Sequence, residues 1–238
     1  MKKKFELINV YEKPDITKFL LKKHNPNYDF HFIEIPFRML IIGSSGSGKT
    51  MTLYNLMRFF SGTFQNIYIT TKNKKEPIYE LIEEKIEINN SNPKKNQFHL
   101  QINEGIENLP NLDDFDKNEP SLIVLDDLVL ERNQKKIEEY FIRCRKLNIS
   151  VIYISQSYFL VPKIIRQNLS YLIIKQVSSM RNLKLIANEY SLGLTSEKLK
   201  KIYDFCTQSK SDFLFIDLEN QDYKFRKNLD FVINIDSL

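Results

Sequence analysis

The chain has 238 residues, of which 42% are hydrophobic and 27% charged, as in globular proteins with a sizeable core. Its two cysteines form no CxxC pair and its three histidines are scattered, so the sequence excludes a recognisable zinc site or disulfide framework. The net charge of +5 permits a nucleic-acid partner without requiring one. Because no apolar run approaches about 18 residues, we expect a soluble, intracellular protein with no membrane partner.

Strands and helices are predicted to alternate after an N-terminal segment, residues 1–35, whose role the sequence leaves unclear. Continuous apolar runs predict strands, and apolar residues at helical spacing predict helices. The sequence predicts strands over 37–43, 65–71, 98–102, 120–128, 149–157, 171–177 and 212–218, the last pairing with 223–227. It predicts helices over 48–60, 76–88, 132–147, 180–191 and 195–206, and a loop over 89–97. The alternation predicts an α/β domain over 36–238 with a mostly parallel sheet flanked by helices.

The loop between the first predicted strand and helix is GSSGSGKT, residues 43–50, which matches G-x-x-x-x-G-K-[ST] in full. Glycines let the backbone N–H groups of such a loop turn inward onto phosphates, and the following helix directs its positive end at them. Lys49 is predicted to reach the outer phosphates of ATP, and the Thr50 hydroxyl to bind Mg²⁺. The predicted nucleotide-binding residues are Gly43, Ser44, Ser45, Gly46, Ser47, Gly48, Lys49, Thr50 and Met51.

Two acids follow a buried-type strand in LIVLDD, residues 122–127. Many strands end in an acid, so this pattern is weak alone. Downstream of a phosphate loop, however, its carboxyl end is expected beside the phosphates. Asp126 is then predicted to hold Mg²⁺, directly or through water, and Asp127 to orient or deprotonate the attacking water.

Two further polar features lie around the next predicted strand, 149–157. Gln156 at its end is placed to sense the γ-phosphate or position water. More often, a polar residue at this position simply ends a strand and has no role in a site. Arg143 and Arg145 precede the strand, at the end of a predicted helix. The helix dipole alone favours cations there, and the functional alternative is an arginine finger supplied to a neighbouring subunit.

Taken together, three segments resemble the genome-packaging ATPases of large nucleocytoplasmic DNA viruses and virophages. They are PFRMLIIGSSGSGKT, SLIVLDDLVLERN and FIRCRKLNISVIYISQSYFLVPKIIRQNLSYLIIKQ. These belong to the FtsK–HerA superfamily of DNA translocases. The resemblance covers about residues 36–218, and its specific part runs from Phe141 to Gln176. It implies a RecA-like P-loop NTPase in which the strand ending near Gln156 lies between the phosphate-loop strand and the Asp126 strand.

The resemblance further implies a ring, a hexamer or pentamer, with ATP bound between subunits. It implies ATP-driven movement of double-stranded DNA into a preformed capsid at the host-cell site of virus assembly, with capsid or portal proteins as partners. By position, Lys49 and Thr50 match the phosphate-loop pair, Asp126 the Mg²⁺ acid and Gln156 the sensor glutamine. Arg145 matches the best finger position, and Arg166 matches a basic position to which we assign no role.

The sequence departs from the family pattern at Asp127, where cellular members usually carry Glu, and at Cys144, where viral members often carry Gly. DNA contact in such rings is mostly to phosphates, and KNKK (72–75) and NPKKNQ (92–97) are candidate loops, although solvated surface loops read the same way. Three alternatives stay open: a small-molecule P-loop kinase, a slow ATP-dependent switch, and a cellular-type DNA translocase.

Overall fold

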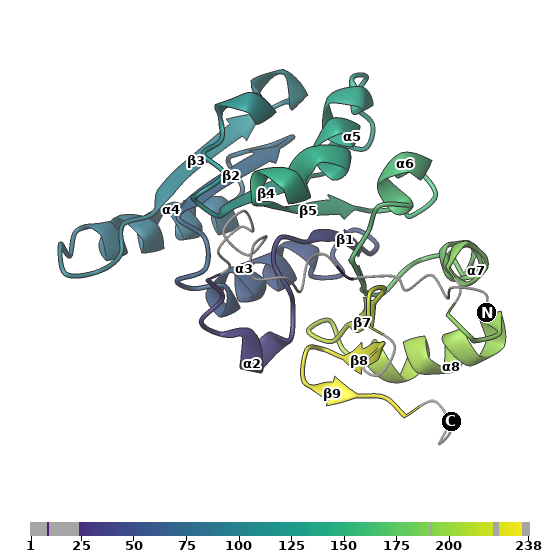
Figure 1. The fold of residues 1–238 in the computed structure, drawn as a ribbon. Coiled ribbons are helices and arrows are strands. Elements are labelled where there is room, and N and C mark those ends of the chain that lie inside the picture. Colours follow the sequence, from purple (N-terminus) through teal and green to yellow (C-terminus); the bar gives the residue numbers. More distant parts are fainter. Residues whose placement is uncertain (1–8, 10–23, 191, 221–223, 235–238) are drawn as a thin grey trace, which may run out of the picture.

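The computed structural model describes residue 9 and residues 24–190, 192–220 and 224–234. Nine strands of this part of the chain form one sheet in the order β3-β2-β4-β5-β1-β6-β7-β8-β9 (Figure 1). The first six in that order are parallel to their neighbours, and β7, β8 and β9 pair antiparallel. The strands are β1 (Arg38–Ile42), β2 (Asn66–Thr71), β3 (His99–Glu104), β4 (Ser121–Asp126), β5 (Ile149–Ser155), β6 (Tyr171–Ile174), β7 (Leu214–Asp217), β8 (Phe225–Lys227) and β9 (Phe231–Val232).

Helices cover both faces of the sheet (Figure 1). One face carries α3 (Lys49–Phe59) and α4 (Pro77–Asn90), and the other carries α5 (Gln134–Arg143), α6 (Lys163–Arg166), α7 (Arg181–Glu189) and α8 (Ser196–Cys206). Successive strand side chains point to opposite faces, so Leu40 joins one core and Ile41 the other. Both are fully buried, which is why these strands read as continuous apolar runs.

The structure confirms the predicted fold class and the predicted place of β5, which lies between β1 and β4. In register, Leu40 of β1 is opposite Tyr153 of β5, and Val124 of β4 is opposite Ile152 of β5. Because all these strands are parallel, their carboxyl ends meet at one edge. The phosphate loop, the acids after β4 and Gln156 after β5 therefore all lie at that edge.

Several predicted boundaries were wrong by a few residues. The predicted helix over 132–147 ends as an α-helix at Arg143, and its last turn is the tighter 3₁₀ helix η4 (Cys144–Leu147). The predicted loop over 89–97 begins later, because α4 continues through Asn90. The predicted strand over 120–128 stops at Asp126, since Asp127 takes a left-handed backbone with φ +55°.

Residues just before β1 pack against the domain. Ile33 and Ile35 are buried in the core on the α3 side, and the ring of His31, at the end of α2 (Tyr28–His31), packs edge-on against Phe60. Residues 1–8 and 10–23 of the segment 1–35 lie outside the described residues. So do residue 191 of the predicted helix over 180–191 and residue 223 of the predicted partner of the last strand.

Candidate nucleotide site

The phosphate loop connects β1 to α3 at the carboxyl edge of the sheet, between the ends of β5 and β6. The Gly43 N–H donates to the Ser155 carbonyl at 3.3 Å, and the Ser44 N–H donates to the Gln176 carbonyl at 2.8 Å. The loop is therefore attached to both neighbouring strands. Its tip, at Ser45 and Gly46, is exposed, as is Met51 in the first turn of α3.

Gly48 ends the loop with φ +88°, a backbone that L side chains rarely adopt, and a Cβ there would lie 2.9 Å from the Lys210 carbonyl oxygen. Helix α3 begins at Lys49, and no side chain caps its first N–H groups. The buried hydroxyl oxygens of Ser44 and Ser47 have no partner among the described residues. Unpaired donors at a helix N-terminus are what a bound phosphate group satisfies, so the loop fits its predicted ligand.

The Lys49 side chain folds back over the loop and donates a hydrogen bond from Nζ to the Ser44 carbonyl at 3.1 Å. Burial lowers the pKa of Lys49, and the carboxylates of Asp126, Asp127 and Glu76 oppose that shift. The structure thus brings the predicted lysine and both predicted acids together, although Asp126 and Asp127 lie 77 and 78 positions after Lys49 in the sequence.

Asp126 is the last residue of β4 and is only 6% exposed. Burial raises the pKa of its carboxyl group to about 6, and a hydrogen bond from the Tyr79 hydroxyl to Oδ2 partly offsets that rise. Burial and the neighbouring Asp126 raise the pKa of Tyr79, so the phenol is the donor in this pair.

Asp127 lies at the same edge, where its N–H donates to the Ile154 carbonyl at 3.3 Å and its left-handed backbone turns the chain out of the sheet. Gln156, directly after β5, donates a hydrogen bond from Nε2 to Asp127 Oδ1 at 3.4 Å. The predicted water-positioning acid and the predicted sensor glutamine therefore contact each other directly.

The donor chemistry also fits Mg²⁺. The Asp126 carboxylate and the Thr50 hydroxyl are hard oxygen ligands on elements that meet at this edge. No group of three or more His, Cys, Asp or Glu that could hold a metal occurs within the described ranges. In the usual protein site for Mg²⁺, one or two carboxylates act together with substrate phosphates and water.

Two residues of the site were missed by the sequence analysis. Tyr79, on the first turn of α4, holds Asp126, and Glu76, which precedes that helix, contributes to the pKa shifts of both Lys49 and Asp126. Both follow β2, whose last residue Thr71 lies opposite Asp126 in the parallel register. The signal that could have found them is their position just after a strand whose carboxyl end reaches this edge.

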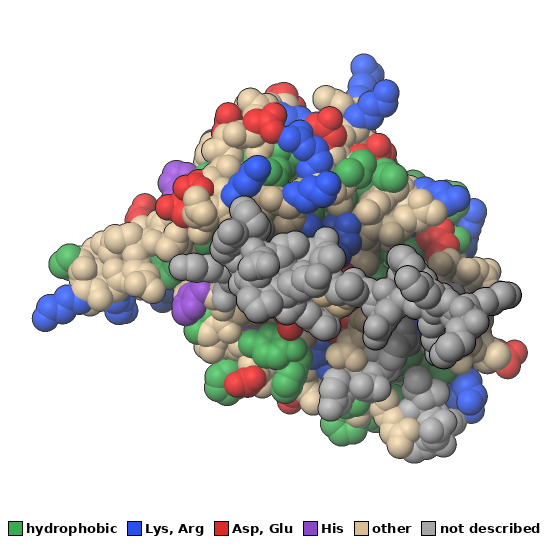
Figure 2. All heavy atoms as spheres, in the orientation of Figure 1, with side chains coloured by type: hydrophobic (Ala, Val, Ile, Leu, Met, Phe, Trp, Pro, Cys, Tyr) green, Lys and Arg blue, Asp and Glu red, His purple; other side chains and the backbone are tan. Residues whose placement is uncertain are grey.

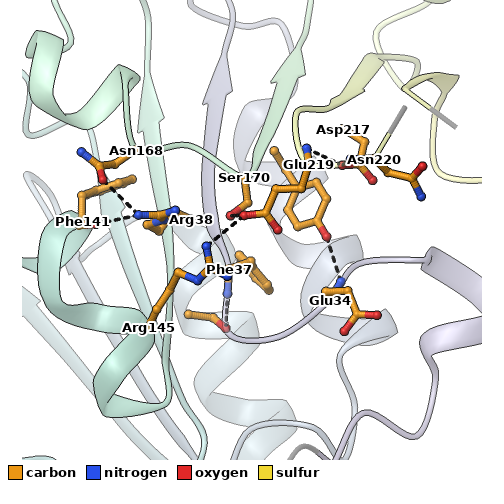
Figure 3. A network of polar contacts seen from close by, with 12 residues as sticks. Glu34, Phe37, Arg38, Phe141, Arg145, Asn168, Ser170, Asp217, Glu219 and Asn220 are labelled. Atoms are coloured by element: carbon orange, nitrogen blue, oxygen red, sulfur yellow. Dashed lines mark hydrogen bonds and ion pairs between the residues drawn. The ribbon is translucent and has the colours of Figure 1, made fainter. Parts of the chain in front are cut away.

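Arg145 lies at the opposite edge of the sheet, in η4 before the first residue of β5 (Figure 3). Its guanidinium forms an ion pair with Glu219 at 3.2 Å, and Glu219 also accepts a hydrogen bond from Ser170 at 3.0 Å. The seven residues of β5 separate Arg145 from Gln156 by roughly 20 Å. Arg145 therefore does not reach the phosphate loop of its own chain.

The other basic candidates have different surroundings. Arg166, in α6, forms an ion pair with Glu189 and stacks over the Tyr158 ring. These contacts within the chain are sufficient to explain an arginine at this position. The two predicted DNA loops lie at opposite ends of α4: residues 72–75 precede it at the edge that carries the phosphate loop, and residues 92–97 follow it.

No helix in the described ranges has the length and apolar character needed to cross a lipid bilayer.

Comparison with known proteins supplies a family and a fold. Residues 27–225 match the profile of the family described as "Poxvirus A32 protein". Comparison with curated protein sequences gave no match.

Among solved structures, the chain is similar to the genome packaging NTPase B204 from Sulfolobus turreted icosahedral virus 2 in complex with ATP-gammaS. The TM-score is 0.56 at 12% identity, covering 82% of this chain and 98% of that one. It is also similar to B204, the DNA-packaging ATPase from Sulfolobus Turreted Icosahedral Virus (TM-score 0.55, 16% identity, 86% and 98% covered). A third similar structure is the cytoplasmic domain of the Thermomonospora curvata Type VII Secretion ATPase EccC (TM-score 0.51, 15% identity, 77% and 24% covered). At these identities the likeness shows a shared fold.

Proposed function

We propose that this chain, which belongs to the Poxvirus A32 protein family, is an ATP-hydrolysing motor that translocates double-stranded viral DNA into a preformed capsid. The chain is a P-loop ATPase of the viral genome-packaging type. One observation carries the proposal: the complete phosphate loop, Asp126, Asp127 and Gln156 converge at one edge of a sheet in which β5 lies between β1 and β4. The proposal is further supported by the fold shared with two packaging ATPases.

In this proposal each site residue has one task in ATP hydrolysis. The N–H groups of residues 43–51 and the Lys49 ammonium bind the phosphates, and Thr50 and Asp126 hold Mg²⁺, which neutralises phosphate charge when it is bound. Asp127 orients the attacking water and accepts its proton, and the contact with Gln156 positions that carboxylate. Gln156 then reports the state of the γ-phosphate to the rest of the chain.

We propose that the chain works as a ring oligomer, a hexamer or pentamer, and the place of Arg145 supports an assembly of subunits. Since this arginine lies roughly 20 Å from its own phosphate loop, it serves as a finger only if a neighbouring subunit presents its nucleotide there. Its ion pair with Glu219 is exposed on both sides, with 53% and 40% of the two side chains accessible, so a phosphate can compete for it.

The proposed DNA substrate is supported by the charge of the chain and by its family. The net charge of +5 and the exposed lysines of 72–75 are compatible with phosphate contacts. On the face seen in Figure 2, Lys and Arg side chains are interspersed with acidic ones over the upper part of the view. Capsid or portal proteins are the proposed partners at the host-cell site of assembly.

The proposal is tested by ATP hydrolysis with and without double-stranded DNA. We expect DNA to raise turnover severalfold, and we expect Lys49→Ala and Arg145→Ala to lose that turnover. Mixing Asp127→Asn subunits with Arg145→Ala subunits should restore part of the activity. One of the two kinds of mixed interface is intact: an Arg145→Ala subunit holds the nucleotide and an Asp127→Asn subunit supplies the arginine. DNA-independent turnover by an assembled, active preparation would overturn the translocase assignment and leave a P-loop phosphotransferase or switch.

A further inference from the structure

A single buried hydroxyl connects helix α4 to the acid at the end of β4. Tyr79 is 0% exposed and donates its hydrogen bond to Oδ2 of Asp126. Tyr79 belongs to the core of the α3 side and Asp126 is buried, so the hydrogen bond between them is shielded from solvent. The orientation of the Asp126 carboxylate is therefore set by the position of the first turn of α4.

The loop in front of that turn is short and ordered. It leaves β2 at Thr71, which is opposite Asp126 in the sheet register, and returns at Pro77, the first residue of α4. The Asn73 N–H donates to Thr71 Oγ1 at 3.3 Å, and the Lys75 N–H donates to Asn73 Oδ1 at 3.1 Å. These side-chain bonds favour a turn conformation that connects the lysines directly to the first turn of α4.

The charge of this loop is directed to solvent. Lys72, Lys74 and Lys75 are all exposed, and each is within seven residues of Tyr79 along the chain. The second basic loop, 92–97, lies beyond the far end of α4, and 14 residues of helix place it about 21 Å away. Of the two loops, only 72–75 lies at the edge that carries the phosphate loop.

We propose that residues 72–79 couple DNA to hydrolysis: the lysines of 72–75 bind DNA phosphates, and Tyr79 is the positioning residue that transmits the bound state to Asp126. This inference rests on the proposed function. Tyr79 touches neither DNA nor nucleotide and acts through Asp126 alone. Glu76, between the lysines and Tyr79, lies near Lys49 and Asp126, so a shift of the loop changes the charge around both.

The role of Tyr79 is tested first by binding, without turnover. Calorimetric titration of ATP at a series of Mg²⁺ concentrations should show that Tyr79→Phe raises the half-saturating Mg²⁺ concentration about tenfold. ATP binding without Mg²⁺ should be unchanged. Tyr140→Phe is the matched control, because it also removes a buried hydroxyl, one that donates to the Pro110 carbonyl on the other face of the sheet. Thermal unfolding establishes that both variants are folded.

The DNA arm compares two pairs of adjacent lysines. Lys74→Ala/Lys75→Ala should weaken DNA binding measured by fluorescence anisotropy and lower its logarithmic salt slope by about 2. It should also reduce the stimulation of turnover by DNA. Lys94→Ala/Lys95→Ala, in the distal loop, should retain that stimulation. Tyr79→Phe should bind DNA as the unmodified protein does, yet respond to it with severalfold less stimulation.

The outcomes of these experiments test the positioning role, the coupling and the proposed function separately. An unchanged Mg²⁺ requirement in Tyr79→Phe overturns the positioning role, and full stimulation in Lys74→Ala/Lys75→Ala overturns the coupling. If DNA does not stimulate the unmodified protein at all, the proposed function fails. The Mg²⁺ titration of Tyr79→Phe still reports on the link between α4 and Asp126 in that case.

Discussion

The Lys175 ammonium donates a hydrogen bond to the Lys210 carbonyl at 2.6 Å, directly behind the phosphate loop. The lysine is fully buried at the end of β6, and its Cβ lies 2.6 Å from where a Cβ on Gly43 would be. The Phe213 ring lies 5.7 Å from the ammonium, and Asp212 is the acid that acts on it. Lys175 thus joins the loop before β7 to the back of the phosphate loop.

The pH dependence of stability should reveal this buried charge. Burial lowers the pKa of Lys175 to about 8, below the usual 10.5. Between these values the unfolded chain binds more protons, so stability rises with pH and is lost as pH falls back through 8. Urea unfolding from pH 7 to 10 should show the unmodified protein gaining up to about 1.4 kcal/mol per pH unit over Lys175→Met above pH 8. A constant difference across that range would contradict the assignment.

His31 should make the protein sensitive to acid. Burial and the nearby Arg226 lower its pKa to about 4, and its Nδ1 accepts a hydrogen bond from the Ile33 N–H at 3.0 Å. The unfolded chain binds the extra proton between pH 6.5 and 4, so stability falls as pH falls through this window. We expect a loss of about 3 kcal/mol in the unfolding free energy. His31→Asn retains an acceptor but does not titrate, and its unfolding free energy should be flatter with pH.

Gly48→Ala should weaken both the fold and ATP binding. The new Cβ would meet the Lys210 carbonyl at 2.9 Å, and the φ of +88° costs about 1–2 kcal/mol for an L residue. Gly193→Ala is the matched control, since its φ of +69° carries the same cost but nothing lies within 4 Å of the added Cβ. Both variants should melt at lower temperature, and calorimetry should show lost ATP affinity for Gly48→Ala alone.

Glu219→Gln should separate the structural and functional roles of Arg145. The ion pair is exposed, so its loss should change the unfolding free energy by less than about 1 kcal/mol. Since Glu219 then no longer competes with phosphate for the arginine, DNA-stimulated turnover should be maintained or raised, whereas Arg145→Ala should lose it. A turnover loss in Glu219→Gln as large as that in Arg145→Ala would show that the pair itself is required.

Local sequence was sufficient for much of the fold and of the site. The phosphate loop, the acids after β4 and the glutamine after β5 are short patterns next to strands, and strands buried on both faces are recognisable as apolar runs. The errors concern ends of elements. Arg143 ends α5 because the chain tightens into η4, and Asp127 leaves β4 through a left-handed backbone; neither feature has a periodic signal in the sequence.

The residues that the sequence analysis missed are held by long-range contacts. Tyr79 contacts Asp126 across 47 positions, and Lys175 contacts Lys210 across 35. A tyrosine at helical spacing in α4 indicates only a core position, and a lysine after an apolar strand is typical of a surface. The roles of Tyr79 and Lys175 become visible only once the sheet order places β2 beside β4 and β6 beside β1.

By itself, the sequence determined that the chain is an α/β P-loop protein, and it predicted the lysine, the acids and the glutamine of the candidate site, because those features depend on residues close together in the chain. Only the tertiary structure decided which edge each residue occupies. It placed Arg145 at the edge opposite its own phosphate loop and Tyr79 against Asp126. The physical reason is that strand order, set by packing of apolar faces between distant segments, converts positions along the chain into positions in space.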